Sequence, residues 1–279
     1  MDVAVSNWRG RRVFVTGGVG FLGNAVVKQM LARGAEVIGL VRDRAAAAAF
    51  TRHRLAGRIH IIHGRSDDLF RVHSALAVHE VQAAFHFPSS DGPPLDHGLV
   101  TVLEAVRKYN PVVPVVSSRP DSAGSLLTSP APLGVARFDE LFGPDPESRG
   151  LVASTIAALL AGERVLPDDR DSRDFVPVAD AARACLLLAE AVAKHPVPHV
   201  REATFRTGWQ FTERELAASI RDAIAARPPL VSLLAQPANP LGWSPSLNFA
   251  EALADTVAWY RAQAARAPGV RLDRARIAA

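Results

Sequence analysis

Short apolar runs alternate with longer amphipathic stretches from near the start of the chain to about residue 116. The apolar runs have the length of strands and occupy residues 12–16, 36–41, 59–62, 83–87 and 112–116. Nearly continuous apolar strands separated by helix-length segments are typical of a parallel sheet that is covered on both faces. The pattern therefore predicts an α/β fold with a doubly wound parallel sheet.

The second half of the chain is patterned differently. Residues 117–132 are rich in Ser, Pro, Gly and Asp, a composition typical of loops. Helical periodicity returns at about residues 148–161, 178–195, 212–226 and 248–265. We therefore expect a sheet domain over residues 1–145 and a smaller, mostly helical lobe over residues 146–279, with one strand free to return to the main sheet.

The first predicted strand runs into a glycine-rich turn, Gly17-x-x-Gly20-x-x-Gly23, which opens the first predicted helix. In a Rossmann-type turn these glycines allow a tight bend, close approach of a pyrophosphate and close helix packing. The helix start adds free N–H groups and a positive dipole end. A merely glycine-rich turn is the alternative, but the flanking strands and helix favour a dinucleotide site. The expected contacts are Thr16, Gly17, Gly18, Val19, Gly20, Phe21, Leu22 and Gly23.

The residue after the second predicted strand bears on the choice of dinucleotide. Sites that prefer NAD place an acid there, where it accepts hydrogen bonds from the ribose hydroxyls. This chain has Val41 followed by Arg42. An arginine pairs with a 2′-phosphate or stacks on adenine, so Arg42 favours NADP over NAD. The alternative is a solvated surface arginine.

Several motifs resemble the extended short-chain dehydrogenase/reductase family, which includes the nucleotide-sugar epimerases and dehydratases. VTGGVGFLG is similar to the family's TGxxGxxG, and AEVIGLVRD is similar to its second strand. GVARFDELFGPD resembles the family's TRxxNxYGPG turn near the substrate, and RDFVPVADAARACLLLAE its entry to a substrate-side helix. LGWSPS and TVAWYR resemble its C-terminal lobe. The resemblance implies a Rossmann-type fold, an NAD(P) cofactor and a nucleotide-sugar substrate.

The catalytic motif of that family is missing. The resemblance implies a Tyr-x-x-x-Lys helix, whose tyrosine exchanges a proton with the substrate while the lysine lowers its pKa. Only Tyr109 and Tyr260 exist, and the residues four positions later are Val113 and Ala264. Residues 119–133 are too few for a complete catalytic helix with its connections. We infer that this segment is deleted.

Other departures lie around the expected site. The family's adenine-contacting Asp in G-D-x-x-D is replaced by Arg65, and its H-x-A-A sequence becomes His86-Phe87-Pro88-Ser89. In the turn near the substrate, Glu140 replaces an Asn and Phe142 replaces a Tyr.

A second group of residues takes its expected roles from the resemblance. Ser117 joins the cofactor contacts, and Ser118 takes the place of the catalytic Ser or Thr. A strand-end serine satisfied by nearby backbone is the alternative for Ser118. Arg173 is placed to pair with a nucleotide-sugar diphosphate. Substitute acid/base groups, if the protein turns over, are Asp121, His86 and Glu140, with Ser118 as a further candidate.

Composition and charge exclude several classes. Hydrophobic residues make up 48% and charged residues 22% of 279, which is typical of globular proteins. The net charge is +4, but the arginines are scattered and carry no nucleic-acid motif. We find no apolar run of about 18 residues and no signal peptide, and expect a cytoplasmic protein. The mixed charges from Asp168 to Asp171 indicate surface ion pairs, whereas Arg173 and Asp174 are set apart because they match the family's entry to its substrate-side helix.

The potential metal ligands are few or poorly arranged. Cys185 is the only cysteine and lies in apolar surroundings, so it reads as a buried small side chain. His60 and His63 stand three apart on a predicted strand and face opposite sides. We expect no metal site.

Three functional hypotheses remain open on the sequence. The first is a non-catalytic family member that binds a dinucleotide, or keeps only the fold, and acts as a regulatory or scaffolding protein. The second is an active epimerase, dehydratase or oxidoreductase with a substitute acid/base. The third is a decayed gene, against which the one-sided helices argue. A protein partner or homodimer stays open, because the family dimer uses the missing helix.

Overall fold

The computed structural model describes residues 8–53, 55–88, 97–118, 128–146, 148–165, 171–227 and 237–266. The chain forms two compact units, and each of them is discontinuous in sequence. The first comprises Met1–Arg137 with Ala181–Phe205, and the second Phe138–Asp180 with Arg206–Ala279. These units differ from the division expected at residue 145, because the chain leaves the first unit after Arg137 and returns to it from Ala181 to Phe205.

The first unit is built on a seven-stranded, wholly parallel sheet with strand order β3-β2-β1-β4-β5-β6-β9. This arrangement confirms the predicted doubly wound α/β fold. The last strand, β9, pairs with β6, although the chain between these two strands includes residues 138–180 of the second unit. The strands are β1 Arg12–Thr16, β2 Glu36–Val41, β3 Ile59–His63, β4 Ala83–His86, β5 Val115–Ser118, β6 Pro132–Arg137 and β9 His199–Thr204.

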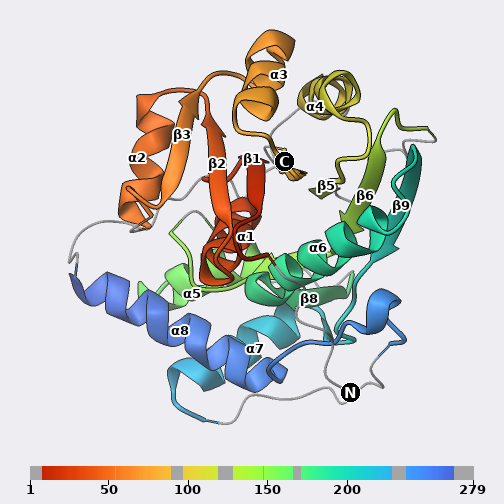
Figure 1. Ribbon diagram of the computed structural model, residues 1–279. Coiled ribbons are helices and arrows are strands. Elements are labelled where there is room, and N and C mark those ends of the chain that lie inside the picture. The colour runs from red at the N-terminus through yellow and green to blue at the C-terminus, as the bar shows by residue number, and fades with distance from the viewer. Residues whose placement is uncertain are drawn as a thin grey trace. The chain divides into compact units, whose positions relative to one another are not determined.

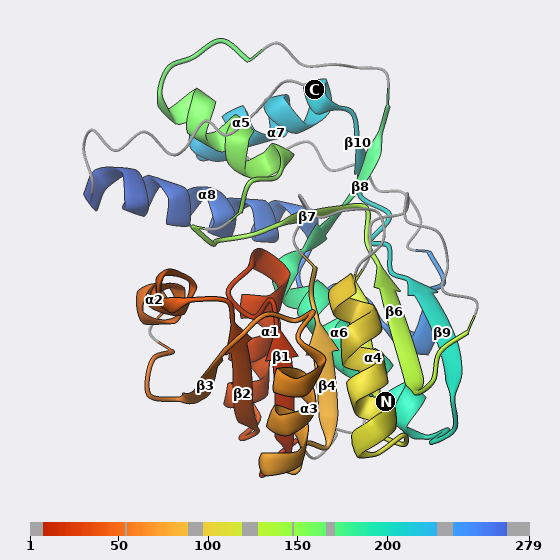
Figure 2. The same ribbon diagram turned by 90° about the horizontal axis from the view of Figure 1, so that it is seen from above.

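Helices cover both faces of this sheet (Figures 1 and 2). α3 and α4 pack side by side on one face over a cluster that includes Phe14, Leu133 and Val135. Gly134 therefore points to the other face, where a side chain at that position would meet Leu188 of α6. The helices are α1 Phe21–Ala32, α2 Arg44–Arg52, α3 Leu69–Val78, α4 His97–Tyr109 and α6 Val178–Ala193.

The predicted fifth strand begins three residues later than expected. The side chain of Asn110 accepts a hydrogen bond from Val112 N at 3.3 Å, and its carbonyl accepts one from Val113 N at 3.2 Å. These bonds form a turn, and Pro114 has no N–H to donate. As a result Ser117 and Ser118 lie within β5.

The second unit has its own small sheet and its own core. Its sheet has the order β10-β8-β7, in which β8 is parallel to β7 and antiparallel to β10. Aromatic side chains fill the core, and the rings of Phe211 and Phe249 stack with centroids 4.4 Å apart. The elements are β7 Glu140–Phe142, α5 Leu151–Leu160, β8 Arg173–Pro177, β10 Gln210–Phe211, α7 Glu213–Ile224, the short 3-10 helix η1 Pro240–Gly242 and α8 Phe249–Arg266.

Two buried aspartates join distant segments of the second unit. The carboxylate of Asp174 accepts hydrogen bonds from Thr207 N at 2.9 Å and Gly208 N at 2.7 Å. The carboxylate of Asp180 accepts from Ser246 N at 3.0 and 3.1 Å. Backbone N–H groups left without acceptors in a buried site are costly, so both carboxylates hold the unit together.

Replacing Asp174 by alanine should destabilise the protein strongly. The change leaves two backbone N–H groups at residues 207 and 208 without their acceptor, and we expect a loss of about 3 kcal/mol in the free energy of unfolding. Urea denaturation measures it. The matched control is Asp171→Ala, at an exposed aspartate nearby, with an expected effect within about 0.5 kcal/mol. Equal losses in the two variants would contradict the role assigned to Asp174.

Candidate functional site

The turn between β1 and α1 brings the backbone into unusually close contact with itself. Gly17 has φ of 69°, and a Cβ atom there would overlap the carbonyl oxygen of Phe87. A Cβ atom on Gly23 would overlap the carbonyl oxygen of Gly17. Gly20 differs, since a Cβ on it would meet only Gly17 O, at an ordinary 3.4 Å. Gly17 and Gly23 therefore shape the turn, whereas Gly20 leaves its outer side open.

The start of α1 offers N–H groups that no described side chain caps. Gly20 is the N-cap residue, and the first turn of the helix contains no acidic residue. By contrast, α2 and α3 have Asp43 and Asp68 as their N-cap residues. The side chains of these aspartates accept hydrogen bonds from N–H groups in the first turns of their helices. Free N–H groups with the positive dipole end bind phosphate oxygens. The turn thus has the open side and the N–H groups that a pyrophosphate needs, and pyrophosphate binding there stays a prediction.

Polar side chains stand in register at the same edge of the sheet. Thr16, His86 and Ser117 are paired neighbours on β1, β4 and β5. Thr16 Oγ1 and His86 Nδ1 lie 2.6 Å apart in a buried hydrogen bond. Ser117 Oγ is buried and has no hydrogen-bond partner among the described residues. Carboxyl ends of parallel strands are where ligands bind in such folds.

Two arginines follow the next strands along this edge. Arg42 comes directly after β2, and its side chain is 74% exposed with Asp43 at 3.8 Å. Arg65 follows β3 and pairs with Asp67 through two bonds of 2.9 and 2.7 Å. Because Val41 pairs with His63, the two arginines belong to the same sheet edge.

The residues needed for tyrosine–lysine chemistry lie elsewhere in the fold. Tyr109 ends α4, and Tyr260 is buried in α8, where its hydroxyl donates to the carbonyl of Asp145 at 3.2 Å. Burial raises the pKa of Tyr260 to about 12, opposite to the shift that a catalytic tyrosine needs. The lysines of the chain are Lys28, Lys108 and Lys194. The residues between β5 and β6 include neither amino acid.

The connection that leads from the end of β5 back to the start of the parallel strand β6 is short. These strands are parallel neighbours, with Val115 opposite Leu133 and Ser118 opposite Ala136. The chain must therefore return the length of a strand in residues 119–131. Parallel crossovers need a dozen or more residues, and a helix advances only about 1.5 Å per residue. A long catalytic helix with two connections does not fit this length.

Glu140 and Arg173 lie together in the second unit. Glu140 Oε1 accepts a hydrogen bond from Leu151 N at 2.9 Å and so caps α5, while Oε2 is 3.5 Å from Arg173 Nη1. A side chain at Gly150 would crowd this carboxylate, at 2.6 Å from Oε1. Burial is the main cause that raises the pKa of Glu140, against the bond from Leu151 and the charge of Arg173. Both residues thus have structural partners, which the sequence did not reveal.

The remaining candidates are placed as follows. Ser118 is partly exposed at the end of β5. Asp121 and Ser89 lie outside the described residues, as do Asp168 and its neighbours through residue 170. Cys185 is fully buried, and burial raises the pKa of its thiol.

The described parts of the chain show neither a metal site nor a membrane span. Within them, no group of three or more His, Cys, Asp or Glu side chains is arranged to hold a metal ion. None of the described helices combines the length and the apolar character needed to cross a bilayer.

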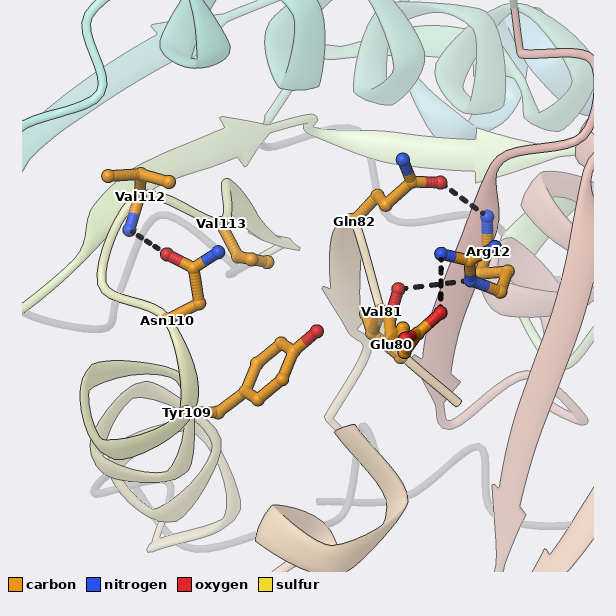
Figure 3. Close-up of a pocket in the computed structure, with 8 residues that line it drawn as sticks. All are labelled: Arg12, Glu80, Val81, Gln82, Tyr109, Asn110, Val112 and Val113. Atoms are coloured by element: carbon orange, nitrogen blue, oxygen red, sulfur yellow. Dashed lines mark hydrogen bonds and ion pairs between the residues drawn. The ribbon is translucent and has the colours of Figure 1, made fainter. Parts of the chain in front are cut away.

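A pocket of about 420 Å³ opens at the other edge of the sheet (Figure 3). Arg12 at the start of β1 pairs there with Glu80 at 3.1 Å, and Gln82 accepts a hydrogen bond from Arg12 N. Tyr109 and Asn110 line the opposite wall. Since Arg12 begins the strand that Thr16 ends, this pocket is separate from the glycine turn.

Replacing Gly17 by alanine should damage the fold more than the same change at Gly10. Both glycines have φ of 69°, so each substitution incurs the cost of a left-handed alanine, about 1 kcal/mol. A Cβ on Gly10 meets nothing within 4 Å, whereas one on Gly17 overlaps backbone. We expect Gly17→Ala to lose at least about 2 kcal/mol more in urea denaturation. Equal losses would show that the close approach is unimportant.

Glu140→Ala should lower the unfolding free energy by about 1 kcal/mol, because α5 loses its cap. Glu140→Gln keeps an acceptor oxygen and should lose less. The raised pKa of Glu140 means that its contribution to stability is full below about pH 4.3 and is lost as pH rises through the folded-state pKa. The wild type should therefore decline relative to Glu140→Gln over that range. Parallel pH profiles of the two proteins would contradict the burial of this carboxylate.

Comparison with known proteins identifies the family to which this fold belongs. The family model for the NAD dependent epimerase/dehydratase family matches residues 13–120 and 132–202, and residues 121–131 fall in the gap between the two. UDP-glucose 4-epimerase of Mycolicibacterium smegmatis is 26% identical over 314 positions, covering 90% of this chain and 98% of the relative. That alignment is longer than the whole chain, so it contains gaps.

Solved structures share the fold. UDP-glucose 4-epimerase of Thermotoga maritima, with UDP-glucose, has a TM-score of 0.68 at 21% identity, covering 90% of this chain and 99% of that one. dTDP-glucose 4,6-dehydratase of Bacillus anthracis, in complex with NAD, has a TM-score of 0.71 at 18% identity, covering 92% and 98%. With the family model matching well over half of its residues, the chain belongs to the NAD dependent epimerase/dehydratase family.

Proposed function

We propose that this protein binds NAD(P) at the β1–α1 turn and lacks the tyrosine–lysine proton transfer of its family, so that it acts as a binding, regulatory or scaffolding protein. The glycine turn supports the binding half of the proposal: Gly17 and Gly23 have no room for a side chain, and the start of α1 keeps its N–H groups available. Bound NAD(P) would supply a hydride donor or acceptor. The chain's own part is to hold the pyrophosphate on those N–H groups.

The observation that carries the non-catalytic half is the short connection between β5 and β6. Residues 119–131 contain no tyrosine, lysine or histidine, and the two tyrosines of the chain lie in α4 and α8. Without a paired tyrosine and lysine beside the cofactor, hydride transfer would lack its coupled proton transfer.

A preference for NADP over NAD is part of the proposal. Arg42 follows β2 at the position where an acid would meet the ribose hydroxyls, and its guanidinium is largely exposed. Asp43, which comes next, caps α2 through Ala46 N at 2.8 Å and is thereby occupied. We expect Arg42→Ala to weaken NADPH binding about tenfold with little effect on NADH, measured by fluorescence titration. Equal effects on the two cofactors would contradict a 2′-phosphate contact.

The second candidate function is an active nucleotide-sugar epimerase, dehydratase or oxidoreductase with a substitute acid/base. The raised pKa of Glu140 favours it, since a carboxyl that holds its proton to higher pH is a better acid at neutral pH. Ser118, Asp121 and His86 are the other candidates. Arg173 would then pair with the diphosphate of the nucleotide-sugar. Alanine substitutions at all four acid/base candidates that left a measured activity intact would reject this function.

Binding and turnover can be tested separately with one variant. Gly20→Ala puts a methyl group at the phosphate cradle yet makes only an ordinary 3.4 Å contact, so the fold should survive. We expect calorimetry to show NAD(P)H binding by the wild type, at least tenfold weaker binding by Gly20→Ala, and similar melting temperatures.

For the turnover assay, excess protein is mixed with NAD(P) and with UDP-glucose or dTDP-glucose. Absorbance at 340 nm reports reduction of the cofactor, and the sugar products are analysed separately. We expect no sugar conversion and no lasting reduction of the cofactor. Cofactor-dependent conversion that Gly20→Ala loses would overturn the non-catalytic half, and absence of dinucleotide binding would overturn the other half.

A further inference from the structure

The edge of the sheet beyond the glycine turn carries an arginine whose guanidinium is held in a fixed plane. Arg65 donates from Nε to Asp67 Oδ1 at 2.9 Å and from Nη2 to Oδ2 at 2.7 Å. This two-point pairing uses one edge of the guanidinium and leaves both of its faces unbonded. The Arg65 side chain is 67% exposed and that of Asp67 39%. An exposed ion pair adds little to stability, but its two-point geometry favours one orientation of the guanidinium.

Strand order indicates which part of a dinucleotide would reach this arginine. The pyrophosphate belongs at the start of α1, beside β1, and the adjoining ribose over the end of β2. The base is attached to the ribose away from the phosphate, and the next strand in the order β1-β2-β3 is β3. Adjacent strands are only about 4.8 Å apart. Arg65, two residues after β3 ends at His63, thus lies where the adenine ring would fall.

We propose that Arg65, held flat by Asp67, is a platform on which the adenine ring of the cofactor stacks. The inference rests on the proposed dinucleotide binding and adds the means of base recognition. A planar guanidinium stacks on an aromatic ring by dispersion and cation–π attraction. Lysine shares the charge but has no plane, so the two residues are not equivalent here.

Stacking and edge recognition predict different base selectivity. A carboxylate at this position would accept a hydrogen bond from the adenine amino group and reject hypoxanthine, which has a carbonyl oxygen there. Arg65 has no acceptor atom, and stacking is tolerant of the base because every base has a π face. The protein should therefore bind ADP and IDP with similar affinity.

The experiment titrates the full-length protein with ADP, IDP and NAD by calorimetry. We expect wild-type dissociation constants for ADP and IDP within about twofold of each other. Arg65→Lys should weaken both by about 5- to 10-fold, the scale of one base-stacking contact, and Asp67→Ala should weaken both in the same direction. Arg58→Lys is the matched control, at an exposed arginine before the other end of β3, and should change neither. Arg65→Asp should make ADP preferred over IDP.

Two results would overturn the platform while leaving the proposed function intact. In the first, Arg65→Lys binds ADP as tightly as the wild type does. In the second, the wild type prefers ADP over IDP tenfold. In both cases NAD binds the wild type, and Gly20→Ala weakens that binding at least tenfold. Failure of NAD, ADP and IDP all to bind the wild type would instead reject the proposed function, and the platform with it. Melting temperatures of all variants within about 2 °C of the wild type show that the comparison is between folded proteins.

Discussion

β5 and β6 are parallel neighbours, so the chain that leaves the carboxyl end of β5 must return to the opposite edge of the sheet before β6 begins. In this protein residues 119–131 make that return. The register of the last strands depends on it, because β6 in turn pairs with β9. The length of this connection limits what it can hold, and its residues include neither a tyrosine nor a lysine.

The carboxyl end of β1 has the features that cofactor binding would need. Gly17 passes too close to Phe87 for any side chain, and Gly23 too close to Gly17, which fixes the turn without reference to catalysis. Thr16 and His86 bond to each other at the same edge, and Arg42 and Arg65 follow β2 and β3 there. Under the proposed function, the glycine turn binds the cofactor although the tyrosine–lysine pair is absent.

Local sequence patterns predicted most of the strands of the first unit and the position of the glycine turn. β1 and β2 lie where the apolar runs predicted them, because buried parallel strands are marked by their own composition. β5 was misplaced, since the turn at Asn110 competes with an apolar run. The roles of Glu140 and Asp174 depend on partners 11 and 33 residues away, which no local pattern records. The discontinuous units arise in the same way, from β9 pairing with a strand more than 60 residues earlier.

A crystal structure after soaking with NADP or NAD tests the central claim most directly. The account predicts density for the pyrophosphate on the N–H groups that follow Gly17, and no side chain able to exchange a proton within about 3.5 Å of a substrate atom that could lie against C4 of the nicotinamide. An acid/base group at that distance, from any part of the chain, would contradict the non-catalytic assignment. Density for the dinucleotide anywhere other than the glycine turn would contradict the account of the site.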